Sequence, residues 1–319
     1  MLLSLCLIFL FGVNLANARP IKDPVKIESG LISGFTYGDK NELRIFKGVP
    51  YAAPPVGELR WKPPQPPAYW EGVKNTKKPC AWCPQPESIV FARRTGPQSE
   101  DCLYLNIWST AKDTEEKRPV MVWIHGGGST TGFGGSLFYS GGKLARRGVV
   151  VVTINYRLGP LGYLAHPLLS EESEKGVSGN YGFLDQIAAL KWVKKNITAF
   201  GGDPDNVTIF GESAGAVAVT RLMVSPLAKG LFHRAIAQSG GAFGRNRHLR
   251  ERKYNMESAE ASGERVARML GCDQADDPLA AMRAKSAEEI IEATNQAGPG
   301  AVRERHQIWS YRGRLGCPG

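Results

Sequence analysis

A serine between two glycines is the strongest chemical signal in this sequence. Residues 211–215 read GESAG, with a short apolar run (207–210) before them and a helix-compatible run (214–223) after them. A sharp turn from a strand into a helix holds such a serine in a strained conformation and exposes its hydroxyl above the sheet. The pattern therefore predicts that Ser213 is a nucleophile, whereas a structural serine is the alternative.

A run of glycines supplies the second part of the same chemistry. Residues 125–128 read HGGG and follow the apolar run 120–124. Consecutive glycines weaken regular structure, but they let backbone N–H groups turn toward an oxygen and form an oxyanion hole. Alone the run is equally typical of a flexible loop. Beside a G-x-S-x-G turn it favours acyl transfer, which needs both parts.

Strands and helices alternate around these motifs. Four apolar runs rich in β-branched residues are typical of strands buried on both faces of a parallel sheet: 120–124, 149–154, 207–210 and 235–237. One helix face is predicted by apolar residues three and four apart: Phe183, Ile187, Leu190, Val193 and Ile197. Further helices are expected at about 256–270 and from Ser286, where Glu289 completes a capping box. The alternation predicts an α/β fold.

Length and charge limit the number of domains and the classes of partner that are expected for this chain. The chain has 319 residues, 42% of them hydrophobic, and a formal net charge of +10. This length allows one large α/β domain or two ordinary domains. The basic residues are mostly dispersed, so nucleic-acid binding is not expected; a polyanion binder would instead lose affinity steeply with salt. Cys80 and Cys83 have CxxC spacing, but no second pair accompanies them, so no metal is expected.

The two ends of the chain differ from its middle. Residues 2–13 are almost wholly apolar, and Ala16 and Ala18 stand where a signal peptidase reads small residues. We expect residues 1–18 to be a signal peptide cleaved near Ala18, with a buried first strand as the alternative, and the mature protein to be secreted. Residues 19–298 form the expected domain, and 299–319 an irregular Arg-rich tail.

Several ordered motifs resemble the type-B carboxylesterase family, which includes the cholinesterases and has the α/β-hydrolase fold. The likeness runs from about residue 25 to about 295, and the matching stretches are 46–57 (FKGVPYAAPPVG), 99–106 (SEDCLYLN), 123–128 (WIHGGG), 155–159 (NYRLG), 200–204 (FGGDP), 211–215 and 238–240 (QSG). The resemblance implies a carboxylic ester hydrolase that works through an acyl-enzyme, without cofactor or metal, on small-molecule esters. A non-catalytic binding or adhesion-type module on the same fold is the alternative.

The resemblance also assigns roles to individual residues. It makes Ser213 the nucleophile and gives the oxyanion-hole N–H groups to Gly127, Gly128 and Ala214. It places Glu212 and Ser239 just behind them.

The resemblance further pairs Cys83 with Cys102 in a disulfide, and implies ion pairs between Arg60 and Glu100 and between Arg157 and Asp185. The pairing of Cys80, Cys272 and Cys317 stays open.

The acid and the histidine of the family's catalytic triad are not found after Ser213. Only 106 residues follow it, His233 and His248 come too soon, and His306 lacks the family's flanking pattern. A serine without a base is a weak nucleophile. We therefore expect an N-terminal portion of a carboxylesterase, truncated or frame-shifted near residue 298, with a central sheet that lacks its last strands and with weak or no activity.

Two further expectations concern ligands and glycans. Trp82 lies just outside the predicted disulfide loop, and Arg93 and Arg94 within it would repel a cation, which disfavours choline esters. Of the two glycosylation sequons, Asn206 begins a predicted strand and should stay bare, whereas Asn196 near a helix end is the one open to modification.

Overall fold

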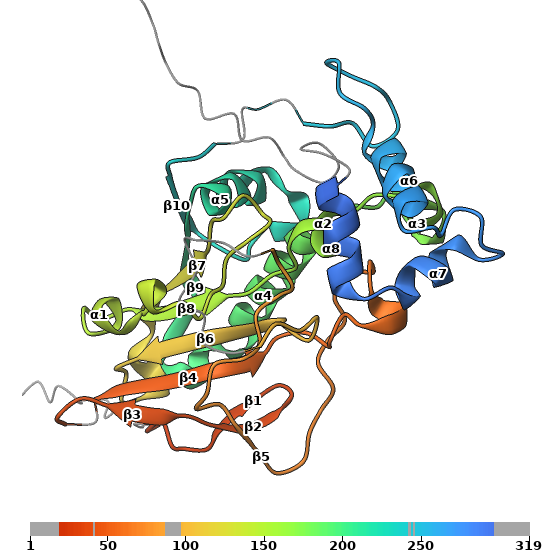
Figure 1. The fold of residues 1–319 in the computed structure, drawn as a ribbon. Coiled ribbons are helices and arrows are strands. Elements are labelled where there is room, and N and C mark those ends of the chain that lie inside the picture. The colour runs from red at the N-terminus through yellow and green to blue at the C-terminus, as the bar shows by residue number, and fades with distance from the viewer. Residues whose placement is uncertain (1–18, 41, 87–96, 242–243, 245, 297–319) are drawn as a thin grey trace, which may run out of the picture.

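A seven-stranded mixed sheet forms the centre of the protein in a computed structural model that describes residues 19–40, 42–86, 97–241, 244 and 246–296 (Figure 1). In spatial order its strands are β10 (Arg234–Gln238), β9 (Gly202–Glu212), β7 (Arg118–Ile124), β8 (Val150–Ile154), β6 (Tyr104–Ser109), β4 (Leu43–Pro50) and β3 (Phe35–Tyr37). The first four run parallel, and the last three pair antiparallel. The predicted α/β fold is confirmed, and its parallel half carries both glycine-rich motifs.

A second, small sheet lies beside the antiparallel half. It consists of β1 (Val25–Ile27), β2 (Gly30–Ser33) and β5 (Val73–Asn75). Short 3-10 helices occur in the connections: η1 (Gly57–Leu59), η3 (Thr114–Glu116), η4 (Leu137–Tyr139), η5 (Ile197–Phe200) and η6 (Pro226–Ala228).

Helices on the two faces of the sheet enclose its core. On one face α4 (Tyr181–Asn196) and α5 (Ala214–Val224) pack against the inward side chains of β7, β8 and β9 in one continuous hydrophobic cluster. On the other face the short α1 (Gly142–Ala145) packs with β6 and β8. The helix predicted from the spacing of Phe183 to Ile197 is α4, and the helix expected after Ser213 is α5.

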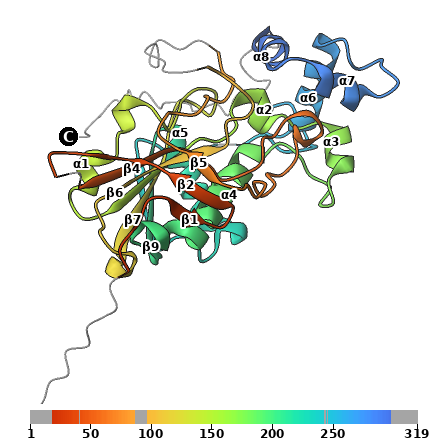
Figure 2. The ribbon, with the colours of Figure 1, turned by 90° about the horizontal axis from the view of Figure 1, so that it is seen from below.

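The remaining helices gather at one end of the sheet. They are α2 (Gly159–Tyr163), α3 (Pro167–Glu172), α6 (Ala259–Met269), α7 (Pro278–Ala284) and α8 (Ala287–Gln296), and most contribute to a second hydrophobic cluster. Figure 2 shows α6, α7 and α8 at the end opposite α1.

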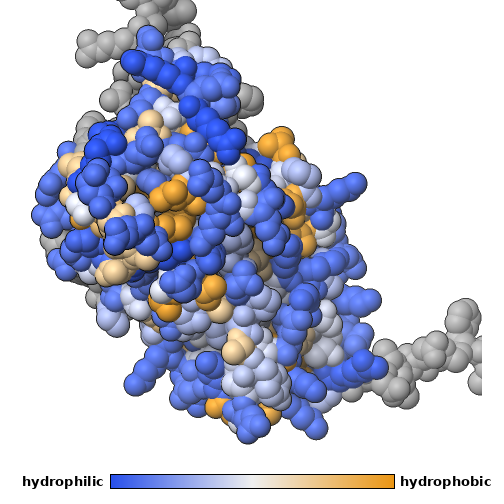
Figure 3. Space-filling model, turned by 90° about the vertical axis from the view of Figure 1, so that its right-hand side faces the viewer, coloured by the Kyte–Doolittle hydropathy of each residue, from blue (hydrophilic) through white to orange (hydrophobic). Residues whose placement is uncertain are grey.

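The predicted capping box at the start of α8 is present, because Glu289 N donates to Ser286 Oγ (3.1 Å) and Ser286 N donates to Glu289 Oε2 (2.7 Å). Figure 3 shows a mostly hydrophilic surface on this side.

Burial of the strands differs from the sequence expectation. Only β8 is buried along its whole length, whereas β7 and β9 alternate between buried and half-buried residues. The run 235–237 lies in β10, whose residues are exposed or half-buried. The prediction of burial on both faces was wrong for β10, because in the described part of the chain it is an edge strand whose free edge no strand covers.

The ion pairs and the disulfide that the family resemblance implies are present in the structure. Asp185, at 0% exposure, receives bonds from the backbone N (3.0 Å), Nε (2.8 Å) and Nη2 (2.7 Å) of Arg157. Arg60 Nε donates to Glu100 Oε2 at 2.8 Å. A disulfide joins Cys83 and Cys102. The loop after β8 is thereby fixed to α4, and segments of the chain between β4 and β6 are fixed to one another.

One expectation about glycans was wrong. The side chain of Asn196 is buried at the end of α4, where its Nδ2 donates to Trp192 O (2.9 Å) and its Oδ1 accepts from Glu28 N (2.7 Å). The amide nitrogen that a glycan would need is therefore occupied in the fold. Asn206 is half-buried within β9 and accepts a bond from Arg234.

Some predicted segments fall outside the described residues. These are the signal peptide (1–18), the Arg-rich tail (299–319) with His306 and Cys317, and the arginines Arg93 and Arg94. Within the described ranges, no helix is long and apolar enough to cross a membrane.

Candidate active site

Ser213 occupies the turn between β9 and α5. Its backbone has φ 54° and ψ −120°, a conformation that non-glycine residues rarely adopt. The turn is held from both sides, because Ser213 N donates to Gln238 O (2.9 Å) and Ser213 O accepts from Val217 N (3.1 Å). The strained strand-to-helix turn predicted for this serine is therefore present, and the residue is half-buried.

The two flanking glycines are required by close packing. A Cβ on Gly215 would lie 2.1 Å from Ile124 O, and one on Gly211 would lie 2.6 Å from the carbonyl carbon of Gly215. The first turn of α5 thus packs directly on the end of β7, where the HGGG motif begins. Any larger residue at either position would separate the serine from that motif.

The glycine loop lies against the serine turn. A Cβ on Gly126 would approach Glu212 O to 2.7 Å and Ser213 Cβ to 3.2 Å. The structure therefore brings together two motifs that lie nearly ninety positions apart in the sequence, residues 125–128 and 211–215. This contact follows from the parallel pairing of β7 and β9, in which Ile124 is the partner of Gly211.

Hydrogen bonds fix the carbonyl groups of this loop. His125 Nδ1 lies 2.8 Å from Gly126 O, and Gly127 O accepts from the backbone N–H groups of Thr130 (3.1 Å) and Thr131 (3.0 Å). In a trans peptide the following N–H points away from the carbonyl. With the carbonyls of Gly126 and Gly127 held, the N–H groups of Gly127 and Gly128 face the opposite side. Positive φ angles of 102° and 64° at these two glycines permit this conformation.

His125 serves the loop as a buried neutral hydrogen-bond donor. Burial lowers its pKa to about 4, although the bond to Gly126 O acts in the opposite direction. The ring stacks on Tyr156 at 4.4 Å between centroids, and the Tyr156 hydroxyl donates to His125 O at 2.7 Å. Because a carbonyl oxygen can only accept, Nδ1 carries the proton of the neutral ring.

The other predicted site residues surround the serine. Ala214 is buried at the start of α5, and the exposed Glu212 places Oε2 beside Gly126. Burial, and then the charge of Glu212, raise the pKa of Tyr139 in η4. Ser239 is exposed with φ 55°, and a Cβ on its neighbour Gly240 would lie 2.4 Å from Ser213 O.

The described histidines are engaged elsewhere. Each of three uses Nδ1 to accept from a backbone N–H: His166 from Leu168 (3.2 Å), His233 from Val207 (3.1 Å) and His248 from Glu251 (3.0 Å). His125 lies under the glycine loop. No hydrogen bond joins Ser213 to a histidine within the part of the chain that the structure describes. Among the described residues, the structure therefore brings the serine turn and the glycine loop together without a histidine bonded to Ser213.

The sequence also singled out the cysteines, a possible metal site and Trp82. Cys80 and Cys272 are free thiols, and burial raises the pKa of Cys80 to about 12. The described residues contain no group of His, Cys, Asp and Glu that could hold a metal ion. Trp82 is buried and stacks on Phe133 at 4.5 Å, so this ring face is already occupied.

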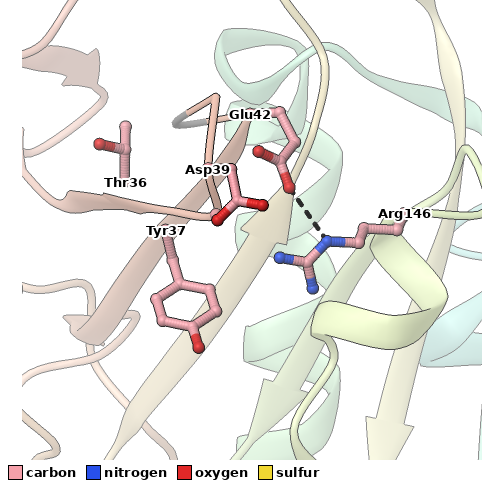
Figure 4. A pocket seen from close by; sticks show the side chains of 6 residues that line it. Thr36, Tyr37, Asp39, Glu42 and Arg146 are labelled. Atoms are coloured by element: carbon pink, nitrogen blue, oxygen red, sulfur yellow. Dashed lines mark hydrogen bonds and ion pairs between the residues drawn. The ribbon is translucent and has the colours of Figure 1, made fainter.

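A pocket at the β3 end of the sheet is remote from the serine. Residues of the β3–β4 turn and Arg146 line it, and Figure 4 shows Glu42 and Arg146 pointing toward each other across it, 3.1 Å apart. β3 and β10 are the two opposite edges of the sheet, and Ser213 follows β9. None of the residues that line this pocket belongs to the serine turn or to the glycine loop.

Comparison with known proteins agrees with this geometry. The profile of the Carboxylesterase family matches residues 22–311. The chain belongs to the carboxylesterase family. This esterase-family chain is 48% identical over 233 residues to a fumonisin B1 esterase of Sphingopyxis macrogoltabida, covering 73% of the chain and 43% of that relative. It is 45% identical over 276 residues to a para-nitrobenzyl esterase of Bacillus subtilis, covering 85% and 52%.

Solved structures show the same relation. A PNB esterase structure superposes with a TM-score of 0.75 at 41% identity, covering 85% of this chain and 53% of that one. A carboxylesterase structure from Geobacillus stearothermophilus gives 0.74 at 43% identity, covering 88% and 54%. The chain thus spans about half the length of the relatives it matches.

Sequence reasoning missed the residues that hold the loop from behind. Tyr156 supports His125, and Gln85 bonds the far end of the loop at Gly132. Gln85 lies two positions after the disulfide cysteine Cys83. Nothing in its spacing indicates that it contacts a loop 47 positions away.

Proposed function

We propose that this chain carries the nucleophile and the oxyanion hole of a serine carboxylic ester hydrolase. The observation that carries the proposal is the contact of Gly126 with Glu212 and Ser213, which places a donor loop beside a strained serine. The esterase relatives support the same class of substrate, a carboxylic ester.

The proposed reaction proceeds in two steps. Ser213 Oγ attacks the ester carbonyl carbon while its proton passes to a base, and the N–H groups of Gly127, Gly128 and Ala214 stabilise the negative oxygen. The alcohol leaves with a proton, and an acyl-Ser213 ester remains. Water then attacks that ester through a second tetrahedral intermediate and releases the acid. The chain needs no metal or cofactor for these steps.

The rate of ester hydrolysis that the 319 residues alone can reach depends on a general base and on the acid that orients it. Because the described histidines are engaged with the backbone or lie under the loop, we propose that Ser213 stays unactivated in this chain by itself. Loss of the base typically removes most of the rate of a serine hydrolase. The chain matches about half the length of these esterases.

Complementation tests this proposal. Residues 19–298 are joined to the part of the Bacillus subtilis relative that follows its matched region, and hydrolysis of p-nitrophenyl acetate is measured. We expect the 319-residue chain to be slow and unaffected by Ser213→Ala. The joined protein should be faster by about three orders of magnitude or more, and Ser213→Ala should abolish the gain.

The matched control is Ser225→Ala at the end of the same helix, which should leave the rate unchanged. Fast hydrolysis that survives Ser213→Ala would contradict the role of the serine. A joined protein that folds but neither hydrolyses the ester nor reacts with a fluorophosphonate would favour the non-catalytic binding module.

We also propose that the protein is exported. The Cys83–Cys102 disulfide supports an oxidising compartment, and residues 1–18 have the pattern of a signal peptide. The intact mass of exported protein tests this, because a species that begins near Arg19 is expected. A species that retains residues 2–15 would contradict it.

A further inference from the structure

The side-chain amide of Gln85 clasps the backbone of the oxyanion loop. Gln85 Nε2 donates to Gly132 O (2.9 Å), and Gly132 N donates to Gln85 Oε1 (2.9 Å). The side-chain amide thus donates one hydrogen bond to the backbone of Gly132 and accepts one from it, as a residue does in a paired β-strand. Gln85 is 4% exposed, so these bonds are largely shielded from solvent.

Gln85 is itself held by two further hydrogen bonds. Its Nε2 also donates to Cys83 O (3.0 Å), and its backbone N donates to Gln98 Oε1 (2.8 Å). Cys83 is tied by its disulfide to Cys102, which precedes β6. The amide is therefore anchored to the sheet through the disulfide loop rather than through the loop that it contacts.

Gly132 connects Gln85 to the hydrogen bonds that orient the N–H groups of Gly127 and Gly128. A Cβ on Gly132 would lie 2.2 Å from His125 Nδ1, so the glycine presses directly on the nitrogen that holds Gly126 O. The preceding Thr131 uses both its N–H and its hydroxyl on Gly127 O, each at 3.0 Å. Moving Gly132 would disturb the bonds that fix both carbonyls, and with them the directions of the Gly127 and Gly128 N–H groups.

We propose that Gln85 is a positioning residue for the oxyanion hole. It touches neither the serine nor the substrate, and acts by holding Gly132 against His125. The inference rests on the proposed function, in which the N–H groups of Gly127 and Gly128 stabilise the negative oxygen. Because that charge exists only in the transition state, loss of the clasp should lower kcat and leave KM unchanged.

The first experiment needs no turnover. Amide hydrogen exchange is measured on the 319-residue chain and on its Gln85→Met variant, which keeps the volume but makes neither bond. We expect exchange within residues 126–132 to rise about tenfold, the effect of one or two lost buried hydrogen bonds. Gln186→Met is the matched control, because Gln186 is equally buried in α4 but neither side-chain polar atom has a hydrogen-bond partner. It should leave residues 126–132 unchanged.

A second variant covers the case in which Gln85→Met unfolds. Gln85→Glu keeps the volume and the acceptor for Gly132 N, but an ionised carboxylate cannot donate to Gly132 O. Its exchange should lie between those of the parent and Gln85→Met, confined to the same residues. Exchange at 126–132 that matches the Gln186→Met control in a folded protein would overturn the proposal.

The second experiment separates the positioning role from the proposed function. In the joined protein described above, Gln85→Met should lower kcat by about 10- to 100-fold with KM within about twofold. A rise in KM at constant kcat would overturn the proposal. The joined protein could show faster exchange at 126–132 with Gln85→Met and yet hydrolyse no ester in any variant. This result would support the positioning role of Gln85 and contradict the proposed ester hydrolase function.

Discussion

The interior of the sheet and its β10 edge are built from similar residues but differ in what surrounds them. Ile154 in β8 has strands on both sides and is 0% exposed, whereas Ile236 in β10 is 43% exposed. In register, Ile236 stands beside Phe210, and Phe210 beside Trp123, in a row across the sheet. At β8 the same kind of side chain is enclosed by both neighbours and helices. Apolar character therefore predicts a strand, but neighbouring elements decide how much that strand contributes to stability.

The largest expected difference between interior and surface concerns ion pairs. Asp185→Asn leaves Arg157, which is 4% exposed, without its carboxylate, and should lower the free energy of unfolding by about 3–5 kcal/mol. Lys195→Ala breaks the exposed Lys195–Glu28 pair (59% and 57% exposed) and should cost under about 1 kcal/mol. Urea unfolding of both variants measures the contrast. Equal losses would mean that burial does not separate these regions.

Truncation of the two matched isoleucines tests the comparison directly. Ile154→Ala opens a cavity among packed neighbours and should cost about 2–5 kcal/mol. Ile236→Ala removes atoms that are largely in water and should cost under about 1 kcal/mol. The same unfolding measurement applies. A loss at Ile236 comparable to that at Ile154 would show that something covers the β10 edge in solution.

The buried His125 predicts a pH dependence of the free energy of unfolding. Its pKa of about 4 in the fold lies below the ordinary 6.5, so the unfolded chain binds more protons between these values. Stability is therefore fully present above about pH 6.5 and falls as the pH drops to 4, by about 3 kcal/mol for this residue. Burial also lowers the pKa of His166, which acts in the same direction.

Comparison with a variant isolates the contribution of His125. His125→Gln should flatten the fall in unfolding free energy between pH 7 and pH 4 by that amount, although it destabilises the protein at pH 7. A parallel pH profile in the variant would place the titration elsewhere.

The smallest expected effect concerns association through the open edge. An exposed strand edge with apolar side chains favours pairing with another chain. Ile236→Lys should shift the sedimentation profile toward monomer, with a change in stability under about 1 kcal/mol. Val224→Lys adds the same charge at an 80% exposed site at the end of α5 and should leave association unchanged. Equal effects of the two lysines would point to net charge rather than to the edge.

Local sequence predicted much of the fold because its signals act over a few residues. The spacing from Phe183 to Ile197 indicated α4, and Ser286 with Glu289 indicated the start of α8. The GESAG pattern indicated the turn at Ser213, since glycines on both sides let the neighbouring backbone approach the strained serine closely. The resemblance supplied the Cys83–Cys102 pair, which local pattern alone could not select among the cysteines.

Tertiary structure decided what depends on distant neighbours. The sequence by itself determined the turn at Ser213, the glycine loop and the helices, because these arise from local backbone preferences and side-chain periodicity. Only the fold brought Gly126 against Ser213, buried Asn196, left β10 at an edge and placed Gln85 on Gly132. These outcomes depend on strand order and on packing between segments far apart in the chain, which no local pattern records.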